Sequence, residues 1–248
     1  VVAGLTALLI GTSAWQYVFI AGALFSLALI PAVAVGFRKA DHPERAPPAE
    51  QAPRMLGTPV LRVRTMLICG SFFFLMFSFY FLTSWMPKML ADNGYSIRAG
   101  ISGAILLNVG GLAGDVVFSL FVMRWRAGAV GPAFMCACFA SALLFALAPF
   151  GLALLVCAAV AIGFLLFGSI LSLYALAPRI YPAKVRATGT GVALGVGRVG
   201  ATLGPYVGGV LISLGWSRPE YVATMSLPLL ISAALAWVLQ RDLPDGPV

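Results

Sequence analysis

Long runs of apolar residues without charge are the feature that most constrains how this chain can fold. A run of about 18 or more such residues is the signature of a helix that spans a membrane. Five runs satisfy this criterion: Tyr17–Phe37, Thr65–Pro87, Ala127–Ala148, Leu152–Ala177 and Tyr221–Gln240. Two further runs each carry one charge: Ala99–Met123 with Asp115, and Ala187–Leu214 with Arg198. The sequence therefore predicts an all-α, polytopic membrane helix bundle, in which Val1–Ile10 is the end of one more helix.

The positions of the basic residues predict how the spans are oriented. Formal net charge is +8, although only 10% of the 248 residues are charged and 61% are hydrophobic. If Arg38–Arg64 is cytoplasmic, most lysines and arginines fall on that side, and only Lys88, Arg98 and Arg218 lie outside. This positive-inside bias predicts a multi-pass protein of the cell (inner) membrane with a cytoplasmic C-terminus. The sequence has no basic patch interleaved with aromatic residues, so this pattern gives no indication of nucleic-acid binding.

A Pro-rich charged segment separates two hydrophobic regions. The stretch RKADHPERAPPAEQAPRMLGTP begins at Arg38 and has almost no large apolar residue, which favours a flexible linker. We therefore expect residues 1–37 to be the end of one helical half and 38–64 to be a cytoplasmic linker. Residues 65–240 would form a six-helix bundle and 241–248 a cytoplasmic tail. This layout is the one expected for a two-half transporter that lacks its N-terminal helical half.

The motif GVGRVG at Gly195–Gly200 matches the dinucleotide-binding pattern G-x-G-x-x-G, and Glu220 lies where a ribose-binding acid would follow. That fingerprint requires a preceding strand in a soluble βαβ unit, whereas this motif lies inside an apolar span. Glycines also allow membrane helices to approach closely. The pairs Gly191/Gly195, Gly200/Gly204 and Gly204/Gly208 have the spacing for this role, so we expect helix packing here and no nucleotide cofactor.

The segment YPAKVRATGTGVALGVGRVGATLGPYVGG, Tyr181–Gly209, resembles the eleventh helix of the major facilitator superfamily. Its run YP…VRATGTG…GVGR…GP is most similar to that of the aromatic-acid:proton symporters. WQYVFIAG at Trp15–Gly22 and YFLTSWMPKML at Tyr80–Leu90 resemble the start of the sixth helix and the end of the seventh. The resemblance implies the C-terminal six-helix half of that fold, preceded by helix six and the end of helix five.

The same resemblance implies a secondary active transporter that couples proton movement to uptake of an aromatic or related organic carboxylate by alternating access. Its partners would be the lipid bilayer, a small organic acid, a proton and the N-terminal half. One departure concerns the Asp-Arg pair common at the cytoplasmic end of the eighth helix, because Met123 precedes Arg124 here. Two alternatives remain open: a carrier of another metabolite, sugar acid or drug, and a non-transporting membrane interaction module.

Arg198 is the strongest candidate for substrate binding. It lies twelve residues beyond Arg186, hence ~18 Å into the membrane at 1.5 Å per residue, near the midplane. A charge there marks a cavity, a partner or a substrate. Gly191, Ala201, Thr202 and Pro205 form a small-sided stripe on its face. Arg198 could bind a substrate carboxylate or form a structural pair with Asp115.

Asp115 lies nine residues before Arg124, about 14 Å from the cytoplasmic edge. Asn108, Gly111 and Asp115 follow i, i+3, i+7 spacing, so this face should look into the bundle, where Asn108 is a further substrate-binding candidate. Asp115 could carry a proton or be a structural, ion-paired acid.

The aromatic stretch SFFFLMFSFYFLTSW, Ser71–Trp85, could supply an apolar wall for a benzoate-like ring. Its residues with i, i+3, i+4, i+7 spacing are Phe77, Tyr80, Phe81 and Ser84. The stripe could equally pack in the core or face lipid. Tyr174, near the cytoplasmic end of its span, is a further substrate-binding candidate.

The remaining charged and reactive residues suggest no catalytic or metal-binding chemistry. One predicted cytoplasmic loop is basic and contains Arg179, Lys184 and Arg186. Cys69, Cys136, Cys138 and Cys157 all lie in apolar spans, and we expect buried, inert thiols rather than a metal site or disulfides. The spans contain no paired aspartates, histidine cluster or Ser/His arrangement. The sequence therefore predicts neither an enzyme nor a metal or cofactor site.

Overall fold

The computed structural model describes residues 20, 22–24, 26–31, 33, 58–91, 97–124, 127–147 and 151–241. The chain divides into two compact units, Val1–Pro48 and Ala49–Val248. In the first unit the described residues are helical and fall within the predicted span Tyr17–Phe37. Most of the predicted linker and the C-terminal tail lie outside the described residues.

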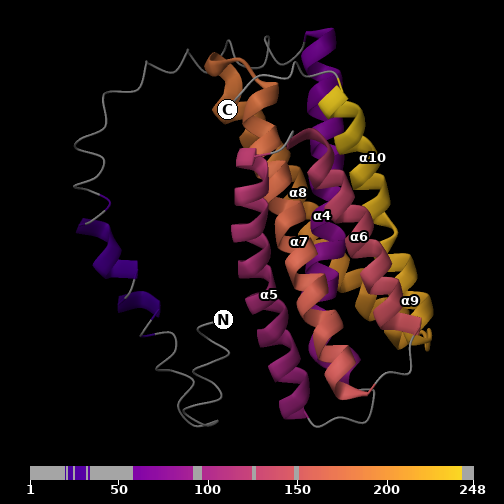
Figure 1. Ribbon diagram of the computed structural model, residues 1–248. Coiled ribbons are helices and arrows are strands. Elements are labelled where there is room, and N and C mark those ends of the chain that lie inside the picture. The colour runs from indigo at the N-terminus through magenta and orange to yellow at the C-terminus, as the bar shows by residue number, and fades with distance from the viewer. Residues whose placement is uncertain are drawn as a thin grey trace. The chain divides into compact units, whose positions relative to one another are not determined.

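The second unit is a bundle of long helices (Figure 1). In chain order these elements are α4 (Pro59–Ala91), α5 (Ile97–Arg124), α6 (Ala127–Leu147), α7 (Leu152–Ile180), the short 3₁₀ helix η1 (Ala183–Val185), α8 (Arg186–Ser213), α9 (Arg218–Ser226) and α10 (Pro228–Arg241). Among the described residues there is no strand. The predicted all-α membrane bundle is therefore confirmed.

Five stretches are long and apolar enough to cross a membrane. They are Pro59–Leu90, Ser102–Leu120, Val130–Leu147, Leu154–Ile180 and Arg218–Arg241. Helix α8 has 28 residues, which gives a length of about 42 Å. Its glycines and Arg198 make it less apolar than these five stretches.

Two helix ends differ from the prediction. Helix α4 begins at Pro59 rather than Thr65, since proline is favoured in a first helical turn and Arg62 N donates to the Thr58 carbonyl at 2.8 Å. The predicted span Tyr221–Gln240 is two helices, because Pro228 has no amide hydrogen and interrupts the ladder. Beside this break, the Ser78 hydroxyl donates to the Met225 carbonyl at 2.7 Å.

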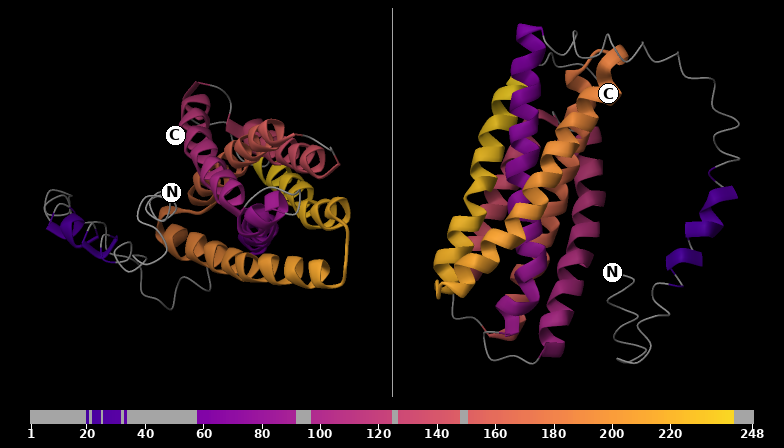
Figure 2. Two further views of the ribbon diagram at one scale, coloured as in Figure 1. Left: turned by 90° about the horizontal axis from the view of Figure 1, so that it is seen from below. Right: turned by 180° about the vertical axis from the view of Figure 1, so that it is seen from behind.

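Helix α8 packs on α4 through a face of buried glycines, and the two helices lie side by side in both views of Figure 2. A Cβ at Gly200 or Gly204 would meet the carbonyl oxygen of Phe73 or Phe77, respectively. The contact is therefore between backbones, as the predicted Gly200/Gly204 spacing indicated. The pair Gly191/Gly195 differs, because a Cβ at either position would meet nothing within 4 Å.

Helices α5 and α7 form a second close pair of the same kind. A Cβ at Gly110 would meet the carbonyl oxygen of Val160, and one at Gly114 would meet that of Phe164. Gly163 of α7 approaches the Leu107 carbonyl of α5 in return. These two glycine-based pairs bring α4, α5, α7 and α8 together with little side-chain volume between their axes.

The expectation of uniformly buried cysteines is wrong for two of the four. Cys138 is fully buried and Cys69 is half-buried, but Cys136 and Cys157 are exposed. The physical reason is that a membrane helix has apolar side chains on its outer face as well, where lipid replaces protein. Apolar surroundings in the sequence therefore do not distinguish core from lipid-facing positions.

Candidate functional site

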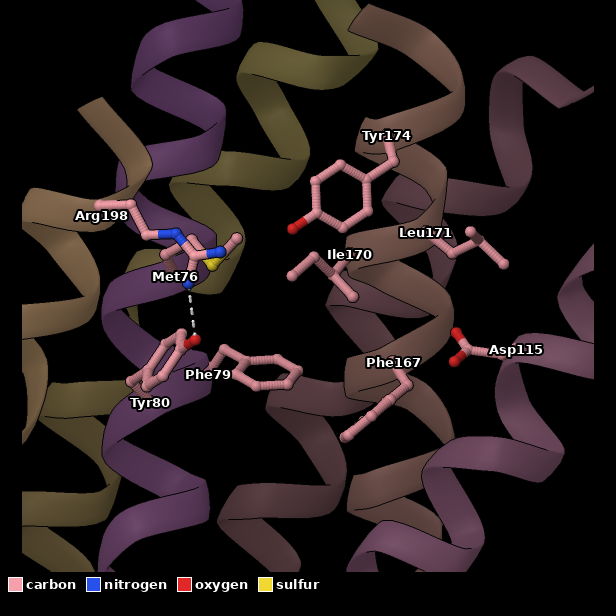
Figure 3. A pocket seen from close by; sticks show the side chains of 9 residues that line it. All are labelled: Met76, Phe79, Tyr80, Asp115, Phe167, Ile170, Leu171, Tyr174 and Arg198. Atoms are coloured by element: carbon pink, nitrogen blue, oxygen red, sulfur yellow. Dashed lines mark hydrogen bonds between the residues drawn. The ribbon is translucent and has the colours of Figure 1, made fainter. Parts of the chain in front are cut away.

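Side chains from α4, α5, α7 and α8 surround a partly open pocket of about 320 Å³ (Figure 3). These four helices are the members of the two close pairs, α4 with α8 and α5 with α7. The lining residues are Met76, Phe79 and Tyr80 from α4, Asp115 from α5, Phe167, Ile170, Leu171 and Tyr174 from α7, and Arg198 from α8. The pocket is thus mainly apolar and aromatic, with one basic and one acidic group.

Arg198 and Tyr80 form the polar contact within this pocket. The Arg198 Nη1 group donates a hydrogen bond to the Tyr80 hydroxyl oxygen at 2.9 Å, across the α4–α8 contact. Gly197 lies next to Arg198 and is buried against Phe72 and Met76 of α4. Because the glycine face lets α8 approach α4 closely, the arginine side chain reaches the tyrosine hydroxyl on the neighbouring helix.

The wall contributed by α7 is aromatic and aliphatic. Phe167 lies against Phe79 of α4, with ring centroids 5.2 Å apart. Tyr174 packs on Phe72 at 5.6 Å, and its hydroxyl points towards the side of the pocket where Arg198 lies (Figure 3). Tyr80 and Tyr174 therefore place two hydroxyl groups at the basic side of an otherwise apolar wall.

Asp115 lines the same pocket from α5, and its carboxylate points towards α7 (Figure 3). The side chain is half-buried. The structure shows no ion pair between Asp115 and Arg198; the arginine contacts Tyr80 instead. The two charges predicted from sequence thus share one pocket without contacting each other.

Three predicted substrate-binding residues do not line this pocket. Phe77 stacks on Phe73 at 6.4 Å and packs at the core beside α8. Ser84 is exposed outside the pocket. Asn108 donates from Nδ2 to the Ala104 carbonyl of its own helix at 2.8 Å. Phe81, assigned to the same stripe, is fully buried and lies edge-on to Tyr221 at 6.2 Å.

The predicted basic loop lies at the connection between α7 and α8. Arg186 begins α8 and Lys184 belongs to η1, and both are exposed. Nearby, the buried Tyr181 donates a hydrogen bond to Thr65 at 3.1 Å, and burial raises the pKa of its phenol. None of these residues lines the pocket. Within the described residues, no group of histidine, cysteine and acidic side chains is placed to hold a metal ion.

Sequence reasoning missed five lining residues: Met76, Phe79, Phe167, Ile170 and Leu171. Met76 and Phe79 of α4 have i, i+3, i+4 spacing with Tyr80. This is the spacing of the predicted stripe that begins at Phe77, shifted by one residue. Those on α7 follow i, i+3, i+4, i+7 spacing and end at Tyr174. Extending that stripe backwards from Tyr174 would have found them.

Several curated proteins are similar to this chain over most of its length. The 3-(3-hydroxy-phenyl)propionate transporter of Escherichia coli is 28% identical over 91% of this chain and 56% of its own. The gallate transporter of Pseudomonas putida is 33% identical over 74% of this chain and 40% of its own. The benzoate transport protein of Acinetobacter baylyi is 30% identical over 76% of this chain and 41% of its own. All three are named as transporters rather than enzymes, and the chain spans about half the length of the curated relatives it matches.

The similarity at family level covers most of the chain. Residues 1–200 match the sequence profile of the Major Facilitator Superfamily. This match includes the apolar helices α4–α7 and the first part of α8, which carries Arg198. It agrees with the resemblance of the Tyr181–Gly209 segment and with the names of the relatives. The chain belongs to the major facilitator superfamily.

Proposed function

We propose that this chain provides the C-terminal six-helix half of a secondary transporter for aromatic or related organic carboxylates. Transport would be coupled to protons and would proceed by rocking of two helical halves around a site near the midplane. The relatives named as transporters of gallate, benzoate and a hydroxyphenylpropionate support this substrate class. An N-terminal helical half would complete the pathway.

The position of Arg198 is the observation that carries the proposal. Its guanidinium lies on α8, a helix of 28 residues and thus long enough to cross a membrane, and is held by Tyr80 at the edge of an aromatic pocket. A carboxylate that leaves water for a low-dielectric cavity needs a fixed positive partner, and guanidinium provides parallel donors for both carboxylate oxygens. The contact with Tyr80 uses one N–H of Nη1, and the remaining N–H groups of the guanidinium stay available for a ligand.

The size and lining of the pocket suit a small aromatic ring. Ligand pockets are commonly about 300–1,000 Å³, so about 320 Å³ favours a ligand at the small end of that range. Phe79, Phe167 and Ile170 supply apolar area for a ring face. The arrangement therefore combines one positive charge, two hydroxyl groups and an apolar wall, as a benzoate-like acid requires.

The topological part of the proposal rests on charge. We place Arg38–Arg64 and the C-terminus in the cytoplasm, in an inner membrane, because basic residues concentrate on that side. Residues 1–37 would then belong to the N-terminal half, 38–64 to the linker, 65–240 to the bundle and 241–248 to the tail. Arg179, Lys184 and Arg186 would lie in a cytoplasmic loop.

Binding of benzoate to the protein in lipid nanodiscs tests this proposal. Arg198→Lys should weaken binding, because lysine offers a compact point charge, and Arg198→Ala should abolish it. Arg186→Ala, on the same helix but outside the pocket, is the matched control and should bind as wild type does. Benzamide, which has no carboxylate, should bind wild type weakly and should lose little more in Arg198→Ala. Unchanged benzoate binding by a well-expressed Arg198→Ala variant would contradict the proposal.

A further inference from the structure

Asp115 is a carboxylate without a hydrogen-bond or ion-pair partner in the part of the chain that the structure describes. Its side chain is half-buried in the wall of the pocket, and no described residue forms a hydrogen bond or ion pair with its carboxylate. The hydroxyl of Ser119 donates at 2.7 Å to the backbone carbonyl of Asp115, not to the side chain. Arg198, the basic residue of the same pocket, contacts Tyr80. Asp115 is therefore not the structural counter-ion of Arg198.

The side chains around Asp115 do not supply the missing donor. Phe167, Ile170 and Leu171 are the pocket residues of α7 below Tyr174, and all three are apolar. An acidic group in a membrane-spanning helix is costly unless it meets a donor or a cation. Among the described residues the pocket wall provides neither near the carboxylate, so a molecule that enters the pocket can supply the donor.

We infer that Asp115 accepts a hydrogen bond from the ligand, so that the site selects aromatic carboxylates with a hydrogen-bond donor on the part of the ring remote from the carboxylate. This inference rests on the proposed function, in which Arg198 binds the carboxylate. Arg198 on α8 and Asp115 on α5 lie at opposite sides of the pocket in Figure 3. A ring that lies between them presents its carboxylate to one and its far edge to the other.

This arrangement discriminates between positions on the ring. A hydroxyl or amino group at the para position points away from the carboxylate and towards the α5 side. An ortho hydroxyl lies beside the carboxylate and bonds to it internally, so it is not available to Asp115. Unsubstituted benzoate fills the apolar wall equally well but leaves the Asp115 carboxylate unpaired, which costs binding free energy.

Affinities of matched benzoates for the protein in nanodiscs test the inference. Wild type should bind 4-hydroxybenzoate and 4-aminobenzoate about tenfold more tightly than 4-methoxybenzoate, which has an oxygen but no donor. 2-Hydroxybenzoate should bind no better than benzoate. Tighter binding of 4-hydroxybenzoate alone would restrict the ligand class to phenols. Tighter binding of both 4-hydroxybenzoate and 4-aminobenzoate would extend it to aromatic amines.

Variants of Asp115 separate this role from others. Asp115→Ala should weaken 4-hydroxybenzoate binding about tenfold and change benzoate binding about twofold or less. Asp115→Asn retains a neutral acceptor, so its loss should be intermediate. Removal of a charge from a membrane helix favours insertion, and both variants should therefore fold. Ser119→Ala, one turn along α5 and outside the pocket, is the control that should behave as wild type.

Three outcomes overturn the inference, and one of them also overturns the proposed function. Equal loss for benzoate and 4-hydroxybenzoate in Asp115→Ala would make the residue structural. Unchanged binding of both acids in Asp115→Ala would show that the residue does not contact the ligand. If no benzoate binds to wild type, or Arg198→Ala has no effect, the carboxylate site itself is wrong. In the first two outcomes Arg198-dependent binding persists, so the proposed function stands.

Discussion

The Arg198 guanidinium donates from Nη1 to the Tyr80 hydroxyl at 2.9 Å and thereby joins α8 to α4 at the pocket. A tyrosine oxygen that accepts from a cation becomes a better donor through its own O–H group. Tyr80 can therefore hold the guanidinium in place and at the same time donate to a carboxylate bound by Arg198. This relationship is the basis of the first prediction.

Tyr80→Phe should weaken benzoate binding about tenfold without abolishing it, because the charge of Arg198 remains but its orientation and one hydroxyl donor are lost. The same substitution removes little apolar area, so the protein should remain folded. Isothermal titration of the protein in nanodiscs measures the effect. Tyr206→Phe is a suitable control, since Tyr206 of α8 is 70% exposed and lies outside the pocket. Wild-type affinity in Tyr80→Phe would show that the hydrogen bond does not contribute to binding.

Gly204→Ala should destabilise the bundle by about 1–3 kcal/mol, because its Cβ would meet the Phe77 carbonyl of α4 and push the helices apart. Gly195→Ala is the matched control on the same helix, where a Cβ meets nothing within 4 Å. There alanine should be neutral or stabilising by up to about 1 kcal/mol through its helix propensity. Unfolding in detergent with increasing SDS gives both values. Equal stability of the two variants would argue against the close α4–α8 contact.

Ser78→Ala should cost about 1 kcal/mol of stability, because it leaves the Met225 carbonyl beside the Pro228 break without the hydroxyl donor. Ser213→Ala serves as the comparison, since the exposed Ser213 hydroxyl contacts only the Val210 carbonyl of its own helix. Thermal denaturation of both variants in detergent should lower the midpoint for the first and leave it almost unchanged for the second. A similar midpoint for both would mean that water or lipid replaces the Ser78 contact.

The two ends of α8 should lie on opposite sides of the membrane. In a background without the native cysteines, Ala183→Cys should react with an impermeant thiol reagent only from the cytoplasmic side, and Leu214→Cys only from the other. Both positions are exposed and flank a helix of 28 residues. Labelling whole cells and inverted vesicles compares the two sides. Reaction of both cysteines from one side would contradict the proposed orientation.

The sequence by itself determined the all-α membrane architecture. A helix that crosses a bilayer must be long and apolar, so each span can be recognised in the sequence as a long apolar run. The bounds of α5, α6, α7 and α8 agree with the predicted spans to within a few residues. Arg198 and Asp115 could also be singled out, because a charge within an apolar run is costly and therefore conspicuous.

Only the tertiary structure decided which faces of these helices meet. Helix α4 is apolar on all sides, so its sequence does not distinguish the face with Met76 and Tyr80 from the face with Phe77 and Ser84. The distinction arises because buried glycines of α8 pack on the Phe73 and Phe77 backbone, which leaves Phe79 against Phe167 of α7 and Tyr80 against Arg198 of α8. The separation of Arg198 from Asp115 has a similar origin. Opposite charges on two spans can pair only if packing brings their side chains together, and here Arg198 meets Tyr80 instead.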